Sequence, residues 1–129
     1  MITFVLDASA LVELALGTSP ATELVRRVRV GSGAAPELID VEALQVLRRL
    51  ERADPDVSRA ARFVQEAPVA RLPHRPLLER VWQLRHSVSA YDATYVALAE
   101  RFRVPLLTCD ARLGRTHGHD AEVIVYARS

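Results

Sequence analysis

The chain has 129 residues, a formal net charge of +1, a hydrophobic content of 50% and a single cysteine, Cys109. This length suits one domain, 1–129, with its own core, and the near-neutral charge gives no bulk electrostatic reason to bind nucleic acid. One cysteine excludes an intramolecular disulfide, and neither a signal peptide nor an apolar run of about 18 residues for a membrane span is visible, so we expect a soluble, cytoplasmic protein.

Proline and glycine divide the chain into alternating segments of strand and helix type. Thr3 to Leu6 is a short apolar run that ends at Asp7, which is typical of a buried parallel strand,. In chain order, the later segments predict helices over 11–16 and 21–30, a strand over 33–35, helices over 38–50 and 57–66, a strand over 69–72, helices over 77–85 and 89–103, a strand over 104–108, a helical turn over 111–115 and a strand over 122–126.

Two of these helices show an apolar pattern at helical spacing, which predicts the face that each one buries. In the helix over 38–50 the residues that recur in this way are Leu38, Val41, Leu44, Val46, Leu47 and Leu50. In the helix over 89–103 the residues along one side are Tyr91, Tyr95, Leu98 and Phe102.

Strands that alternate with helices predict an α/β fold with a central, mostly parallel sheet of about five strands flanked by helices. In such sheets ligands bind beyond the carboxyl ends of the strands. Asp7 directly follows the first predicted strand, and Asp110 almost directly follows the fourth. Both acids therefore lie at strand ends, which is the first indication of a site.

Asp7, Glu42, Asp92 and Asp110 each have a structural explanation when taken alone. Asp7 and Asp110 could cap helices, and Asp92 could belong to a capping box with Ser89. Glu42 lies near the start of its helix, where the macrodipole favours negative charge. Capping does not explain the set, because Asp7, Asp92 and Asp110 border the apolar core, whereas the other acids of the chain fall on polar faces or in turns.

Carboxylates that converge need compensation. Two like charges about 4 Å apart cost on the order of 4 kcal/mol at an effective dielectric near 20, and protonation, arginine or a metal ion can offset that cost. Mg²⁺ or Mn²⁺ would suit oxygen ligands. Ser9 and Thr108, next to the acids, could orient a carboxylate or bind a water of the metal's outer sphere, although local turn bonding explains them equally well.

The chain contains no lysine, since all 17 basic residues are arginine. A GC-rich genome accounts for such a bias, but the absence of lysine also excludes several rivals. Walker-type phosphate loops, haloacid-dehalogenase phosphatases and response-regulator receivers all place a lysine against a phosphate. Cys109 follows an apolar strand, and we expect it to be buried rather than reactive.

Four segments of the chain carry a resemblance to a known family. They are 5–12 (VLDASALV), 36–44 (PELIDVEAL), 84–100 (LRHSVSAYDATYVALAE) and 105–113 (PLLTCDARL). Together they resemble, in order and separation, the motifs of PIN-domain proteins, and specifically of VapC toxins from VapBC toxin–antitoxin pairs. The resemblance spans essentially the whole chain, and the third segment is its most specific part.

The resemblance implies a metal-dependent endoribonuclease that cleaves cellular RNA (tRNA, rRNA or mRNA) with Mg²⁺ or Mn²⁺ and is neutralised by a cognate VapB-type antitoxin. It also implies a homodimer. The residues that match the family's catalytic and metal-binding acids are Asp7, Glu42, Asp92 and Asp110. Arg85 and Arg112 are candidates for contacts to the RNA backbone, with ordinary surface charge as the other interpretation.

Two alternatives remain at the level of the sequence. The first is a catalytically inactive module of the same fold that binds RNA or a protein while its acids serve as helix caps. The second is another metal-dependent phosphodiesterase, such as a structure-specific DNA nuclease, which the short chain disfavours because it leaves little room for a duplex clamp.

Overall fold

A five-stranded sheet forms the centre of the computed structural model, which describes residues 1–17, 22–54 and 56–127. The strands lie in the order β3-β2-β1-β4-β5, and every neighbouring pair is parallel. Their bounds are β1 Phe4–Leu6, β2 Gly33–Pro36, β3 Val69–Leu72, β4 Leu106–Thr108 and β5 Val123–Val125. The predicted α/β fold with a mostly parallel sheet of about five strands is confirmed.

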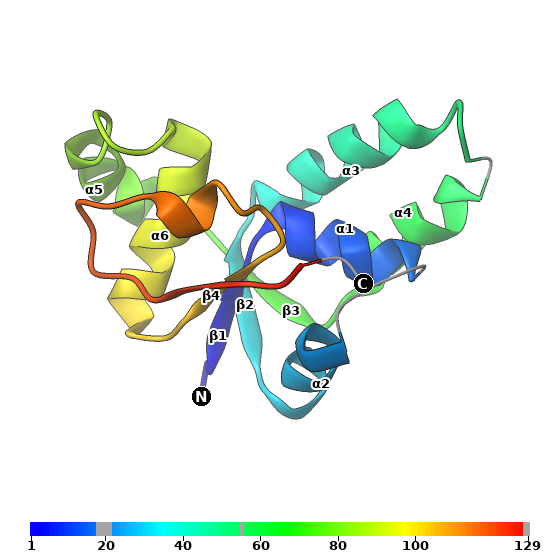
Figure 1. Cartoon of the computed structure of the whole chain (residues 1–129), viewed down its shortest axis with the longest axis horizontal. Helices are drawn as coiled ribbons and strands as arrows, with labels where there is room; N and C mark the ends of the chain where they lie inside the picture. Colours follow the sequence, from blue (N-terminus) through cyan, green and yellow to red (C-terminus); the bar gives the residue numbers. More distant parts are fainter. Residues whose placement is uncertain (18–21, 55, 128–129) are drawn as a thin grey trace.

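Helices cover both faces of this sheet (Figure 1). Their bounds are α1 Ala8–Leu16, α2 Thr22–Val30, α3 Ile39–Leu50, α4 Val57–Glu66, α5 Leu78–Gln83 and α6 Ala90–Phe102, with short 3₁₀ turns at Arg75–Leu77 and Leu113–Arg115. Helices α5 and α6 pack together on one side, whereas α1, α3 and α4 contact one another on the other side. None of the helices in the described ranges is long and apolar enough to cross a membrane.

Strand β1 lies in the middle of the sheet, and all three of its residues are buried. It pairs on one side with β2, where Phe4 faces Gly33, and on the other with β4, where Leu6 faces Leu107. A side chain at Gly33 would collide with the ring of Phe4, so this close approach requires glycine,. The pairing of β1 with β4 brings their carboxyl ends to the same edge, as the predicted positions of Asp7 and Asp110 require.

Helix α1 begins earlier than the apolar pattern predicts. We expected a helix over 11–16, but α1 starts at Ala8 because the Asp7 side chain accepts a hydrogen bond from the Ala10 N–H (2.9 Å) and acts as its N-cap,. The helix ends at Gly17, whose left-handed conformation (φ 66°) suits glycine,. The following helix was predicted from Ala21, which lies outside the described residues, and α2 is described from Thr22.

The predicted buried face of the helix over 38–50 is partly wrong. Val41 is 72% exposed and Leu44 is 37% exposed, while the buried side is formed by Ile39, Ala43 and Leu47. These three residues are spaced by four, so they form one stripe toward α1 and α4,. The apolar pattern is therefore wider than the core contact, and it leaves Val41 and Leu44 on the surface.

The one-sided pattern expected for the helix over 89–103 is also incomplete. Tyr95 and Leu98 are buried, but Tyr91 is 66% exposed. All seven residues from 93 to 99 are buried, because α6 lies against the sheet and is also covered by α5. A helix enclosed in this way has no single apolar stripe.

Arg71 joins the end of α4 to the start of α3. From β3 its guanidinium donates to the backbone carbonyls of Val64 (2.5 Å), Ala67 (2.5 Å) and Val69 (2.7 Å). It also pairs with Asp40 at 3.0 Å. Arginine at a helix end satisfies carbonyls that lack partners within the helix, and here it also fixes the turn of α3 that carries Glu42.

We expect Arg71→Met to lower the free energy of unfolding by about 2–4 kcal/mol, because several part-buried acceptors lose a charged donor. Urea denaturation measures this change. Arg26→Met is the matched control: Arg26 pairs with Glu23 at 3.5 Å while both side chains are about 70% exposed, and its loss should cost less than about 0.5 kcal/mol. Equal losses for the two variants would contradict the role given to Arg71.

Candidate active site at the carboxyl edge of the sheet

The Asp7 carboxylate is buried (5% exposed) at the point where β1 meets α1. Its Oδ1 accepts hydrogen bonds from the Ala10 N–H (2.9 Å) and the Ser9 hydroxyl (2.7 Å), and its Oδ2 accepts one from the Thr108 hydroxyl (2.5 Å). Burial nevertheless raises the pKa of Asp7 from the usual 3.8 to about 6, although these three hydrogen bonds oppose the rise,. The site thus contains an acid that is costly to ionise.

Ser9 and Thr108 hold Asp7 in one orientation. Each hydroxyl gives its single proton to Asp7 and accepts a backbone N–H in return, from Cys109 to Ser9 (2.9 Å) and from Asp110 to Thr108 (3.0 Å). Their own contact of 3.1 Å therefore has no proton left to share,. Among the residues that the structure describes, two donors fill the acceptor sites of Asp7 Oδ1 and one donor binds Oδ2, which leaves Oδ2 one lone pair that can bind a cation,.

Glu42, in the first turn of α3, receives a hydrogen bond from a residue on another helix. The Tyr95 hydroxyl, in α6, donates to Glu42 Oε1 at 2.6 Å. Partial burial raises the pKa of Glu42, the bond from Tyr95 lowers it, and the charge of Asp92 raises it again. The pKa of Tyr95 is itself raised far above its usual range, mainly by burial and by its bond to Glu42.

Asp92 is electrostatically coupled to the other three acids. Burial and the charge of Asp110 raise the pKa of Asp92. In turn, the charge of Asp92 raises the pKa values of Asp7 and Glu42. Asp92 therefore lies within electrostatic reach of each of the other three predicted acids.

Asp110 differs from the other acids because an arginine neutralises it. Arg112 donates to its two oxygens through Nε (3.3 Å) and Nη2 (3.0 Å), and the Arg112 backbone N–H adds a third bond (2.9 Å). Together these contacts lower the pKa of Asp110, with the side-chain bond to Arg112 as the main cause. Arg112 is 80% exposed, so this pair forms the outer rim of the cluster.

The donor set fits a hard divalent cation, because it consists of carboxylate oxygens whose mutual repulsion a cation would relieve. Among residues 1–17, 22–54 and 56–127, however, no three His, Cys, Asp or Glu side chains are already arranged to hold a metal ion. Some contacts to such an ion would therefore pass through water, as Mg²⁺ commonly requires. The metal remains a prediction.

Arg85 lies in the turn that follows α5, where its guanidinium stacks on the Trp82 ring at 4.5 Å from the ring centroid and donates to the Trp82 carbonyl (2.9 Å). Its contact with RNA stays a prediction. Cys109 was expected to be buried, but it is only partly so. It lies one residue beyond the end of β4, where its N–H faces Ser9 rather than the core.

Two residues near the acids were missed by the sequence analysis. Tyr95 was assigned only to a helix face, and nothing in the sequence pairs it with Glu42. Glu13 is 5% exposed and lines a pocket of about 340 Å³ together with Asp110 and Arg112. The sequence does indicate that Glu13 is unusual, because this acid interrupts the apolar run Leu11 to Leu16.

A second pocket, of about 450 Å³, lies beside Glu42 and is lined by Val41, Glu42, Gln45, Val46, Arg49 and Tyr91. Val46 lines this pocket as well as the one beside Asp110. The acids are thus bordered by an apolar surface on α3.

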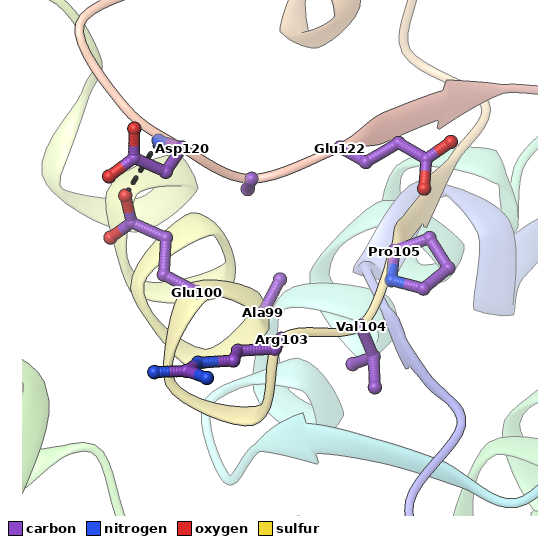
Figure 2. A pocket seen from close by; sticks show the side chains of 8 residues that line it. Ala99, Glu100, Arg103, Val104, Pro105, Asp120 and Glu122 are labelled. Atoms are coloured by element: carbon purple, nitrogen blue, oxygen red, sulfur yellow. Dashed lines mark hydrogen bonds between the residues drawn. The ribbon is translucent and has the colours of Figure 1, made fainter.

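A different pocket, of about 370 Å³, belongs to the opposite end of β4 (Figure 2). The Glu100 carboxylate in this pocket has two structural partners: it pairs with Arg80 at 2.8 Å and accepts the backbone N–H of Asp120 at 2.8 Å. The bond from Arg80 lowers the pKa of Glu100. The ion pair and hydrogen bonds of Glu100 fix α6 against the segment before β5. The pocket lies apart from the acidic site.

Fold and site together define a class: an α/β protein with an acidic cluster at the carboxyl edge of a parallel sheet. The PIN domain model matches residues 4–118. The chain is also 41% identical over 128 residues to ribonuclease VapC12 of Mycobacterium tuberculosis, a match that covers 95% of this chain and 98% of the relative. The chain therefore belongs to the PIN-domain family and, within it, to the VapC branch.

Solved structures share the fold. PAE2754 from Pyrobaculum aerophilum has a TM-score of 0.71 at 23% identity, covering 95% of this chain and 83% of that one. A toxin–antitoxin complex from Klebsiella pneumoniae has a TM-score of 0.68 at 15% identity, covering 95% and 97%. At these identities the similarity concerns the fold alone.

The raised pKa of Asp7 predicts that ionised Asp7 destabilises the metal-free protein. The folded state binds this proton more tightly than the unfolded chain, so stability falls as pH rises from about 4 to about 6 and the full cost applies above pH 6,. We expect Asp7→Asn to raise the free energy of unfolding by about 1–3 kcal/mol at pH 7.5 and to change it little at pH 4.

Urea denaturation in a chelator at several pH values measures this difference. Glu66→Gln, at the exposed end of α4, is the control and should change stability by less than about 0.5 kcal/mol at each pH,. An Asp7→Asn protein that is less stable than wild type at pH 7.5 would mean that the hydrogen bonds to Asp7 outweigh the cost of its burial.

Proposed function

We propose that this chain is an endoribonuclease toxin that depends on Mg²⁺ or Mn²⁺ and cleaves cellular RNA (tRNA, rRNA or mRNA). The observation that carries the proposal is geometric: Asp7 and Asp110 follow the neighbouring strands β1 and β4 at one edge of the sheet. Asp92 lies close enough for its charge to raise the pKa values of Asp7 and Glu42. RNA is proposed as the substrate because a relative that is 41% identical over almost its whole length is named a ribonuclease.

In this mechanism the four acids would bind the cation, and the hydroxyl groups of Ser9 and Thr108 would orient Asp7. Asp7, Glu42, Asp92 and Asp110 would hold the ion, with Oδ2 of Asp7 and Oε2 of Glu42 as the oxygens that could bind it. A divalent cation held there would activate water and neutralise charge on the phosphate and the leaving oxygen. Ser9 and Thr108 keep Asp7 in position, so that its oxygen need not reorient during the reaction.

Arg112 and Arg85 are proposed to contact the RNA backbone. Arg112 is exposed beside the acids and carries a planar guanidinium that can bind a phosphate with two hydrogen bonds,. Its present partner is Asp110, so a phosphate would compete with that carboxylate for it. Arg85 would act from the turn after α5.

We expect the purified protein to cleave RNA with Mg²⁺ or Mn²⁺ and to stop when a chelator is added. Asp7→Asn and Asp92→Asn should each lower kcat/KM by at least roughly 100-fold, because each removes a charged ligand. Gel assays on labelled RNA measure this loss, and Glu66→Gln serves as the active control. Cleavage that survives both substitutions would contradict the proposed site.

The same preparation separates the alternatives. A binding module with structural acids would take up no Mn²⁺ at this site in a calorimetric titration and would leave RNA intact. A DNA nuclease would cleave DNA of matched sequence in preference to RNA. These outcomes differ from one another and from the proposal.

A cognate VapB-type antitoxin is the proposed partner, and the cytoplasm, where the RNA substrates are, is the proposed location. The fold is shared with a toxin in a toxin–antitoxin complex. The antitoxin would lay a helix into an apolar groove and place a basic side chain among the acids, where Arg112 already demonstrates the attraction for a guanidinium,.

We also propose a homodimer, and the structure offers a surface for it. Val41 on α3 and Tyr91 at the start of α6 are 72% and 66% exposed and line the pocket beside Glu42. Exposed apolar residues that gather in this way are typical of protein interfaces. A dimer formed here would place two acidic sites near each other.

Light scattering on the eluting protein should give twice the chain mass of 14.3 kDa. Val41→Glu should convert the protein to monomers, because it buries a charge in the proposed contact. Val30→Glu is the matched control, since Val30 is 80% exposed on α2, and it should leave the dimer intact. A monomeric wild type, or a dimer that persists in Val41→Glu, would contradict this surface.

A further inference from the structure

Tyr95 places a hydroxyl group at the boundary between the core and the acidic site. It is 1% exposed and is the largest fully buried side chain in the described part of the protein. A buried phenol needs a hydrogen-bond partner, and the partner here is Glu42 Oε1 at 2.6 Å. A phenylalanine would fill the same volume without the hydroxyl, so packing alone does not explain a tyrosine at this position.

The direction of this hydrogen bond is fixed by chemistry. A phenol ordinarily titrates near pH 10 and a carboxylic acid near pH 4, so at neutral pH the tyrosine donates and the glutamate accepts. Glu42 Oε1 therefore accepts the hydrogen bond from Tyr95, and its second oxygen, Oε2, can act as a ligand.

The bond also connects two helices that each pack mainly on other elements. Helix α3 packs mainly on α1 and α4, and α6 packs mainly on α5 and the sheet. Tyr95 and Asp92 are three residues apart on α6, so they lie on the same side of that helix,. The hydrogen bond from Tyr95 therefore keeps the Glu42 carboxylate near the side of α6 that carries Asp92.

Glu42 needs such a restraint. Its side chain is only half-buried and has three rotatable bonds, and within residues 1–17, 22–54 and 56–127 Tyr95 is the one group that donates a hydrogen bond to its carboxylate. Asp7 is different, because three hydrogen bonds fix it from its own neighbourhood. Without Tyr95, Glu42 would be free to turn toward solvent.

We propose that Tyr95 is a positioning residue, whose hydroxyl fixes the Glu42 carboxylate in the orientation that lets Glu42 and Asp92 share one divalent cation. This inference rests on the proposed metal-dependent function. It assigns Tyr95 no contact with substrate and no proton transfer, since its effect passes through Glu42.

The test removes only the hydroxyl. Tyr95→Phe should bind Mn²⁺, measured by calorimetry, about 10-fold more weakly than wild type, as is usual when a ligand loses the group that orients it. In RNA cleavage kcat should fall while KM stays the same, because the substrate contacts are intact. Tyr126→Phe, a change of the same type in the segment after β5, should bind Mn²⁺ as wild type does.

A double-mutant cycle separates positioning from a general structural role. If Tyr95 acts through Glu42, the Mn²⁺ affinity of Tyr95→Phe/Glu42→Gln should equal that of Glu42→Gln alone. Losses that multiply would overturn the proposal. So would a Tyr95→Phe protein that binds Mn²⁺ as wild type does, or one whose near-ultraviolet circular dichroism shows a lost fold.

The outcome for the wild type distinguishes this inference from the proposed function. A wild type that neither binds Mn²⁺ nor cleaves RNA overturns both. A wild type that does both, beside a Tyr95→Phe protein with unchanged affinity, overturns only the role of Tyr95.

Discussion

The buried carboxylate of Asp7 is the constraint on which the site depends. The residue ends the central strand and begins the first helix, and Thr108 on the neighbouring strand supplies one of its three hydrogen bonds. A carboxylate removed from water costs free energy unless its lone pairs are satisfied, and here they are satisfied all but once. The three hydrogen bonds stabilise the ionised Asp7 in a buried position that would otherwise disfavour a charge. The remaining lone pair is a position at which a cation could offset that charge.

From Asp7 outward the acids differ in their tendency to ionise. Burial raises the pKa values of Asp7, Glu42 and Asp92, while Arg112 lowers that of Asp110 at the rim. The mutual repulsion of the carboxylates is therefore greatest among Asp7, Glu42 and Asp92. In the described ranges, the only guanidinium bonded to any of the four acids is that of Arg112, at the exposed rim. Such a gradient favours an incoming cation at the inner acids and a phosphate at the outer edge.

Much of this fold was predictable from local sequence. Short apolar runs that end at Asp7 and near Asp110 indicated parallel strands, and their carboxyl ends indicated the site. The errors have tertiary causes. The exposure of Val41 and Leu44 depends on which stripe of α3 meets α1 and α4, and the partnership of Tyr95 with Glu42 joins residues 53 positions apart. Periodicity describes a helix but not the neighbours that it meets, so neither feature could be read from spacing.

The order of the strands also has a consequence for synthesis. The central strand β1 emerges from the ribosome first, but its partner β4 and the Thr108 hydroxyl that holds Asp7 lie about a hundred residues later. Long-range pairing of this kind closes only after the intervening chain is available. A partly made chain can contain Asp7 and Glu42, yet it has neither Asp92 nor the hydroxyl that orients Asp7. The acidic site is therefore a late product of translation, and unfinished chains carry an incomplete one.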